Sequence, residues 1–224
     1  MRRELGCLQA ALRHCHREGY LLDAPSVTLP DRPPTRQRAM TRQEAARLLR
    51  AARALGVPHV ARFILVALYT GTRKEAIFQL RLDGPSMVGG WFDLERGVLH
   101  RRGQGERETT KRRPPVKLPR QMIAHARRWR ACGAVWAVEW RGARVGSIKT
   151  AWRKVAVAAG LEWVTPHTLK HTAITWAIAS GASISDAAGF FGTSAETIER
   201  VYWDASPDFQ RGAVEAMERR GRRL

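Results

Sequence analysis

Residues 165–203 read TPHTLKHTAITWAIASGASISDAAGFFGTSAETIERVYW, and this stretch decides the fold that we predict. Thr165 is a good N-cap residue and Pro166 suits the first helical position, so a helix is expected to begin here. One side of this helix is apolar enough to be buried and carries Leu169, Ile174, Trp176, Ala177 and Ile178. The opposite side is expected to face a cleft and carries, at spacings i, i+3 and i+4, the polar residues His167, Lys170 and His171.

Two shorter helices are expected to follow. Ser183, with Asp186 three residues later, begins the first, and Ser194, shortly after Gly192, begins the second. The second helix carries Tyr202. A single tyrosine in a short amphipathic helix is by default a core or interface residue. A functional role for Tyr202 is therefore indicated only by its spacing from the other motifs.

The stretch resembles the C-terminal half of the catalytic domain of tyrosine recombinases, the phage integrase family. That family has a helix opening H-x-x-R-H, a Leu-Gly-His turn and a nucleophilic tyrosine nine residues after that histidine. His167 and Lys170 match the first element, Thr193 closes the second, and Tyr202 falls nine residues after it. Lys170 stands where the family has arginine, and Thr193 stands where it usually has histidine or tryptophan.

Residues 70–81, TGTRKEAIFQLR, resemble the first motif of the same family. The motif is T-G-x-R at a helix start, with L-R seven and eight residues after the arginine. Arg73 lies where a helix is expected to begin, so its guanidinium and nearby backbone N–H groups are expected to hold a phosphate together. The family often has an acidic residue three positions after this arginine, where this chain has Ala76, with Glu75 one position earlier.

Short strands broken by glycine and proline are predicted between residues 91 and 118, and they indicate a small antiparallel sheet. In the family a hairpin of this sheet carries a mobile catalytic lysine. Lys111 is the best match, and Lys117 is a rival. Because Arg112 and Arg113 follow Lys111, a plain phosphate-contacting loop remains an equal alternative.

The remaining helices are expected at residues 3–18, 41–55, 58–70, 120–131 and 147–159, with a hairpin around Arg141 and a final helix from Ser206-Pro207. Lys149 and Arg153 are predicted to contact DNA from the outer side of the helix at 147–159.

The predicted fold class is therefore mainly α with a small antiparallel β-sheet, an α+β arrangement. The resemblance divides the chain into the last helix of a core-binding domain (1–23), a linker (24–40) and an integrase-like catalytic domain (41–224).

Composition favours a polyanion as the partner. The 224 residues include 39 Lys and Arg against 20 Asp and Glu, which gives a formal net charge of +19. Nucleic acid is the first expectation and an acidic membrane surface the second. Three scattered cysteines predict neither disulfides nor a zinc site, and no apolar run reaches membrane-spanning length. The chain is expected to be cytoplasmic and associated with the nucleoid of a bacterial or phage-infected cell.

The resemblance implies DNA cleavage and rejoining through a 3′-phosphotyrosine, as in recombination or integration by a mobile element. In this scheme the nucleophile is Tyr202, the phosphate is held by Arg73 and Lys170 with one hydrogen bond from Thr193, and protons are moved by His167 and Lys111. The partners implied are duplex DNA and further copies of the chain, as a tetramer on paired sites, and no cofactor is needed.

One alternative stays open beside a working recombinase, and a metal site is also considered. Lys170 and Thr193 each remove a contact of the kind that stabilises a transition state, so catalysis is reduced or lost, and the chain is then a recombinase-derived DNA-binding protein or regulator. His167 and His171 have the i, i+4 spacing of metal ligands, but the glutamate of H-E-x-x-H and a third ligand are missing from the sequence, so no metal site is predicted.

Overall fold

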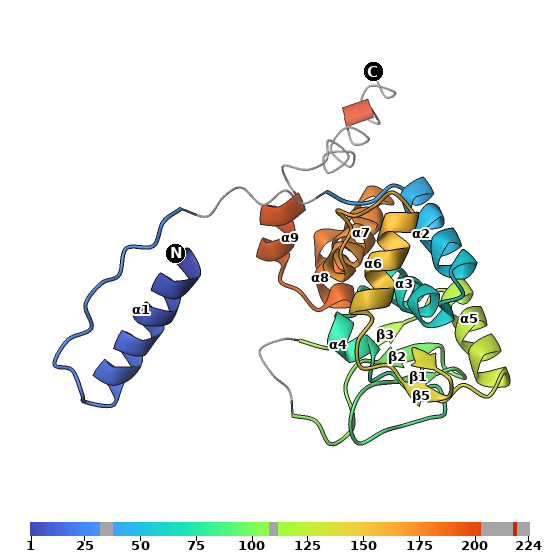
Figure 1. Cartoon of the computed structure of the whole chain (residues 1–224), viewed down its shortest axis with the longest axis horizontal. Coiled ribbons are helices and arrows are strands. Elements are labelled where there is room, and N and C mark those ends of the chain that lie inside the picture. Colours follow the sequence, from blue (N-terminus) through green and yellow to red (C-terminus); the bar gives the residue numbers. More distant parts are fainter. Residues whose placement is uncertain (32–37, 108–111, 203–216, 219–224) are drawn as a thin grey trace. The chain divides into compact units, whose positions relative to one another are not determined.

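The structure, a computed structural model of the 224-residue chain, describes residues 1–31, 38–107, 112–202 and 217–218, without the side chains of residues 200–202. The chain divides into two compact units, Met1–Arg36 and Gln37–Leu224. It is mainly helical with a small antiparallel sheet, which confirms the predicted fold class (Figure 1).

The elements follow the order expected from the sequence. The helices are α1 (Arg2–Arg17), α2 (Arg42–Ala54), α3 (Pro58–Thr70), α4 (Lys74–Ile77), α5 (Arg120–Ala131), α6 (Lys149–Ala158), α7 (Pro166–Ala179), α8 (Ile184–Phe191) and α9 (Ala195–Tyr202). The strands are β1 (Trp91–Asp93), β2 (Val98–His100), β3 (Val116–Lys117), β4 (Glu139–Trp140) and β5 (Ala143–Arg144).

The first unit contains α1, which confirms the helix predicted over residues 3–18. The described residues that follow it, 18–31, form neither helix nor strand. Within the described part of the chain, no helix has the length and apolar character needed to cross a membrane. The assignment of residues 1–23 and 24–40 to a core-binding domain and a linker stays a prediction.

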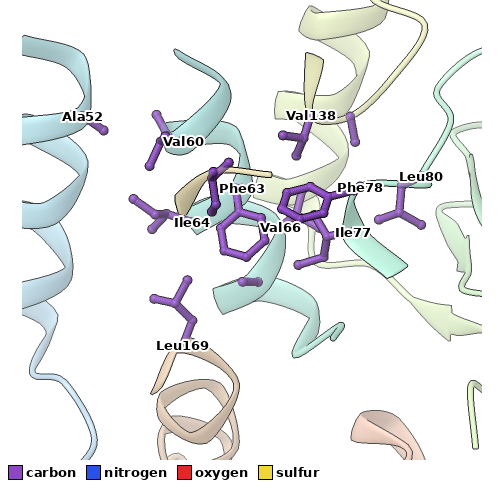
Figure 2. Packing of buried hydrophobic residues seen from close by; sticks show 14 of the residues in the cluster. Ala52, Val60, Phe63, Ile64, Val66, Ile77, Phe78, Leu80, Val138 and Leu169 are labelled. Carbon is purple, nitrogen blue, oxygen red and sulfur yellow. The ribbon is translucent and has the colours of Figure 1, made fainter. Parts of the chain in front are cut away.

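Helix α3 is the central helix of the second unit and packs against α2, α4, α5 and α7. Pro58 at its first turn and Gly71 in the left-handed conformation just after it (φ 59°) fix its two ends. Phe63 is fully buried, and its ring lies 5.5 Å from that of Phe78 and 6.0 Å from that of Trp152 between centroids. Figure 2 shows this ring among side chains of α3, α4 and α7, so one core holds these elements together.

The chain segment before α2 is tied to α7. Thr41 and Glu44 form the predicted capping box at the start of α2. The Met40 N–H donates to Thr172 Oγ1 (3.0 Å), and the Trp176 indole N–H donates to the Met40 carbonyl (2.9 Å). These bonds fix the start of the second unit against the helix that carries the predicted polar face.

The sides of α7 differ in part from the prediction. Leu169 and Ile174 are buried as expected, whereas Trp176 and Ile178 are only half-buried. Lys170, predicted on a face turned toward a cleft, lines a hollow. Its side chain is nevertheless only 9% exposed, because its ammonium lies against the end of α8 and donates to the Phe191 carbonyl.

Two small sheets complete the second unit. Strands β1, β2 and β3 pair in that order and antiparallel, as predicted, and the sheet lies beside α4 (Figure 1). The β4–β5 hairpin turns at Arg141 and Gly142, both with positive φ (52° and 77°), which confirms the predicted turn. Arg81 forms β-bridges to both Trp91 and Trp136, so the segment after α4 links β1 to the segment that precedes β4.

The predicted helix starts in the deciding stretch are confirmed. Thr165 makes a capping box with Thr168 at the start of α7, and Ser183 accepts the Asp186 N–H at the start of α8. Ser194 Oγ accepts the Thr197 N–H at the start of α9. The final helix predicted from Ser206-Pro207 lies outside the described residues.

Replacing Phe63 by alanine is expected to lower the free energy of unfolding by about 3–5 kcal/mol, because the ring fills the junction of three helices and a cavity would remain. Val157→Ala, on a side chain of α6 that is 54% exposed, is the control and is expected to cost less than about 0.5 kcal/mol. Urea denaturation followed by circular dichroism measures both. Similar losses in the two variants would contradict the central place of Phe63.

Candidate functional site

Arg73 lies in a tight turn between α3 and α4. The Thr70 hydroxyl donates to the Val66 carbonyl (2.6 Å) and accepts the Thr72 N–H (3.2 Å), which folds the chain back after α3. Arg73 is the N-cap of α4 and is half-buried. Because α4 has only four residues, its dipole is small, and the positive charge at its first turn comes mainly from the guanidinium of Arg73.

The Arg73 turn is in contact with the end of α8. A Cβ on Gly71 would lie 2.3 Å from the Phe191 ring, so only glycine permits this approach. Gly192 is left-handed (φ 58°), and a Cβ there would lie 2.6 Å from the Arg112 carbonyl oxygen. Three motifs that are far apart in the sequence therefore meet at Phe191 and Gly192.

Lys170 is directed at the same place. Its ammonium Nζ donates to the Phe191 carbonyl (3.1 Å) at the C-terminus of α8. Burial, followed by the charges of Arg73 and Arg101, lowers the pKa of Lys170 to about 8. The side chain remains mostly cationic at neutral pH, but at a cost in free energy that an anion bound nearby would offset.

The two histidines of α7 lie on the edge of the site. Their ring centroids are 4.4 Å apart, with the planes nearly perpendicular. Although much of His167 reaches solvent, partial burial and the charges of Lys170 and Arg73 lower its pKa. Burial, His167 and Lys170 lower the pKa of His171 to about 4. Both rings are neutral at pH 7, so each has a nitrogen that can accept a proton.

A residue that the sequence reasoning missed, Arg101, lies at the centre of the site. It follows β2 and is only 4% exposed. Its Nε donates to Thr72 Oγ1 (3.1 Å), Nη1 to the Phe190 carbonyl (2.6 Å) and Nη2 to the Thr70 carbonyl. Strand alternation was the available signal, because Arg101 shares a face with the buried Leu99.

The basic hairpin contributes at its described end. Arg73 Nη1 donates to the Arg112 carbonyl (3.4 Å), while the Arg112 side chain is exposed. Arg113 pairs with Glu106 (3.1 Å), which also accepts the Gly89 N–H (2.8 Å) and so holds the hairpin to the preceding loop.

Of the two lysines considered for a catalytic role on the hairpin, the structure describes only Lys117. Lys111 lies outside the described residues. The ammonium of the rival, Lys117, donates to the Arg96 carbonyl (3.0 Å), and its side chain lines a different hollow, together with Trp176.

The other predicted residues are placed as follows. Thr193 lines one hollow with Arg73 and Arg112, and its N–H donates to the Ala188 carbonyl (3.2 Å) at the end of α8. Tyr202 is the last residue of α9, and its side chain is outside the described part of the structure. Lys149 and Arg153 are exposed on α6 and line none of the hollows around Arg73.

The hollow between these elements is lined by Gly71, Thr72, Arg73, Ala76, Arg101, Arg112, Arg113, Lys170 and Phe191. Five of these residues are cations and none of them is acidic. In the neighbouring hollow that includes His167, Glu75 pairs with Lys74 (2.9 Å). The described residues contain no group of three or more His, Cys, Asp or Glu that could hold a metal ion. The arrangement is suited to an anion with several oxygens, such as a phosphate.

Comparison with known proteins gives matches at the level of the fold. No protein-family model matches the chain, and no curated protein matches it in sequence. The Tn1549 transposon integrase in complex with transposon right end DNA is 16% identical, with a TM-score of 0.72 over 96% of this chain and 78% of that chain. XerA recombinase is 19% identical, with a TM-score of 0.61 over 93% and 73% of the two chains.

A lambda integrase dimer bound to a COC' core site also matches, at 13% identity and a TM-score of 0.59, over 88% of this chain and 57% of that chain. The chain therefore has the fold of the tyrosine recombinase catalytic domain. The resemblance read from residues 70–81 and 165–203 is confirmed at that level.

Replacing Gly192 by alanine is expected to destabilise the protein more than replacing Gly160. Both glycines are left-handed (φ 58° and 62°), so each alanine introduces about 1 kcal/mol of backbone strain. Only at Gly192 would the new Cβ also meet the Arg112 carbonyl, since nothing lies within 4 Å of a Cβ on Gly160. Urea denaturation compares the two, and equal losses would contradict the close approach of the hairpin to α8.

Lys170 is expected to make stability increase with pH above pH 8. Its pKa is 10.5 in the unfolded chain and about 8 in the fold, so between these values the unfolded chain binds more protons. Relative to Lys170→Met, the wild type is expected to gain up to about 3 kcal/mol across this pH window. Urea denaturation at constant ionic strength checks this, and parallel pH profiles for the two proteins would refute the burial of a charged Lys170.

Proposed function

We propose that the chain binds duplex DNA at this site and cleaves and rejoins one strand through a 3′-phosphotyrosine, as in site-specific recombination. The observation that carries the proposal is the hollow lined by five cations and no acidic residue. Lys170 and Arg101 are buried there as cations, at a cost that a bound phosphate would repay in attraction. The net charge of +19 extends this preference for a polyanion to the whole chain.

In the proposed reaction Arg73 and Lys170 hold the non-bridging oxygens of the phosphate. An ammonium has three N–H donors, and the Phe191 carbonyl accepts one of them, so Lys170 retains donors for the phosphate. Thr193, which shares a hollow with Arg73, adds one hydrogen bond. Charge that develops on the phosphate is stabilised by side chains already in place.

The proton transfers are assigned to side chains as well. Tyr202 is the proposed nucleophile, and His167, neutral at pH 7 because its pKa is lowered, accepts a proton or a hydrogen bond in that step. Lys111 protonates the departing 5′-oxygen. The covalent phosphotyrosine conserves the bond energy, so rejoining needs no nucleotide cofactor.

DNA contacts outside the reacting phosphate are proposed for Arg112 and Arg113 on the hairpin and for Lys149 and Arg153 on α6. The side chains of Arg112, Lys149 and Arg153 are exposed, as contacts to a DNA backbone require. Two of the similar solved structures are integrases bound to DNA, which supports duplex DNA as the partner. Assembly as a tetramer on paired sites and a location on the nucleoid belong to the same proposal.

A second candidate function, DNA binding without cleavage, is favoured by Lys170 itself. Lysine lacks the planar fork of arginine, and this one is 9% exposed and bonded to a backbone carbonyl. Thr193 supplies neither charge nor a large ring. Each lost transition-state contact costs about a hundredfold in rate, so two of them can leave a protein that binds DNA and hardly cleaves it.

A covalent-adduct assay decides between the two. The protein is incubated with a pool of nicked duplexes of random sequence, and adducts are separated on a denaturing gel. A working recombinase is expected to form an adduct that Tyr202→Phe abolishes and that Tyr20→Phe and Tyr69→Phe, at the other two tyrosines of the chain, leave intact. Lys170→Arg combined with Thr193→His is expected to raise the yield about tenfold or more.

An adduct that persists in Tyr202→Phe would refute the assigned nucleophile. If neither the wild type nor the Lys170→Arg, Thr193→His variant forms an adduct while salt-dependent DNA binding is retained, the cleavage proposal fails and DNA binding alone stands. The salt dependence is measured by fluorescence anisotropy with a labelled duplex.

A further inference from the structure

Arg101 is a buried cation whose hydrogen-bond partners among the described residues are all uncharged. Among the described residues it makes no ion pair with a carboxylate, and its three acceptors are the Thr70 carbonyl, the Phe190 carbonyl and Thr72 Oγ1. Thr70 is the last residue of α3, and Phe190 lies in the last turn of α8. The carbonyls at helix C-termini lack intrahelical partners and carry partial negative charge. Two helix ends therefore take the place of a counter-ion for Arg101.

The hydrogen bonds around Thr72 have one consistent direction. The Thr70 hydroxyl donates to the Val66 carbonyl, so at the 2.7 Å contact between the two hydroxyls Thr72 must donate to Thr70. Thr72 Oγ1 is then left to accept from Arg101 Nε. The guanidinium thus fixes the residue immediately before Arg73 as well as the end of α3.

Arg101 and Lys170 hold neighbouring carbonyls of α8. Arg101 donates to the Phe190 carbonyl and Lys170 to the Phe191 carbonyl, although Arg101 follows β2 and Lys170 lies in α7. Thr72, Arg73, Arg101 and Lys170 line one hollow. Any movement of Arg101 would therefore shift the Arg73 turn relative to the carbonyl that holds Lys170.

We propose that Arg101 is a positioning residue of the phosphate site: by bridging the ends of α3 and α8 it sets the spacing between Arg73 and Lys170 and adds positive charge behind both. This inference rests on the proposed function, since it assumes that the hollow binds a phosphate. Arg101 does not itself need to touch the phosphate, because three of its five N–H groups are occupied by the protein.

The first test separates the charge of Arg101 from its bridging geometry. Arg101→Met removes both, and Arg101→Lys keeps the charge but cannot span the two helix ends. Thr72→Val removes the Nε acceptor together with the hydroxyl bond to Thr70, and it leaves the two carbonyl acceptors of Arg101 in place. Arg96→Met is the matched control, since the Arg96 side chain is 83% exposed on the β1–β2 turn. Thermal melts establish that each variant is folded. If Arg101→Met does not fold, Arg101→Lys and Thr72→Val carry the test.

The effect of the Arg101 charge is measured through the pKa of Lys170, which is determined by NMR of ¹³Cε-labelled lysine. Burial aside, the charges that lower the pKa of Lys170 are those of Arg73 and Arg101, and Lys170 in turn lowers the pKa of His167 and His171. The other charged residues that line the hollows of Lys170 are Arg112, Arg113, Lys74 and Glu75. Arg101→Met is expected to raise the pKa of Lys170 by roughly 0.5, toward that of an exposed lysine, whereas Arg101→Lys and Arg96→Met leave it low. An unchanged value in Arg101→Met would overturn the electrostatic half of the proposal.

The bridge is read from hydrogen exchange of peptides that cover the ends of α3 and α8. Both ends are expected to exchange at least about tenfold faster in Arg101→Met, Arg101→Lys and Thr72→Val than in wild type or Arg96→Met. If only one end loosens, Arg101 does not couple the two helices and the proposal fails.

Function is read from the rate of adduct formation on the nicked duplexes. The rate is expected to fall about tenfold or more in Arg101→Met and Arg101→Lys, while DNA affinity falls no further than in Arg96→Met. If the wild type forms the adduct and the rate is unchanged in Arg101→Met and Arg101→Lys, the proposal is overturned. If the wild type forms no adduct, the proposed cleavage fails, and the pKa and exchange measurements still decide the role of Arg101.

Discussion

The C-terminal carbonyls of α8 are the feature on which the site depends. The Phe190 carbonyl accepts from Arg101 and the Phe191 carbonyl from Lys170, and the Phe191 ring lies against Gly71. Helix ends attract cations because their carbonyls carry partial negative charge. Two buried cations from distant parts of the chain are therefore held at one helix end, and no carboxylate of the described residues pairs with either of them. The turn that carries Arg73 is fixed against the same helix end.

Neutralisation by helix ends has a different consequence from neutralisation by a carboxylate. A carboxylate would cancel one full positive charge, whereas peptide dipoles satisfy the N–H donors and leave most of the charge in place. Ala76 contributes to this, since it lines the hollow at the position where an acidic residue would reduce its charge. The lowered pKa values of Lys170, to about 8, and Arg101, to about 10, are the cost in free energy of keeping the site cationic.

Much of the fold was predictable because its signals are local. Three helix starts were each marked by a pair of residues within four positions, and the structure has a helix at each. The pairs are Thr165 with Pro166, Thr41 with Glu44, and Ser183 with Asp186.

The site was less predictable because its contacts are not local. Arg101 meets partners 29, 31 and 89 residues away, and the carbonyl that covers Lys170 is 21 residues away. Neither hydrophobic periodicity nor capping residues in the sequence indicate contacts between residues so far apart. The roles of Lys111 and Tyr202 stay predictions.

Lysine at position 170 changes what the site can do with its charge. Lys170 gives one N–H to Phe191 and Arg101 gives three to the protein, so the hollow keeps its cations while having few donors aimed at an incoming phosphate. A diffuse positive potential attracts a phosphate in the ground state and in the transition state to a similar degree, and such uniform attraction increases affinity without increasing the rate of the bound complex. Directed donors are what distinguish the two states. In the proposed reaction Arg73 is then the group with the most directed donors, so the rigidity of its turn matters more here than in a site with two arginine forks.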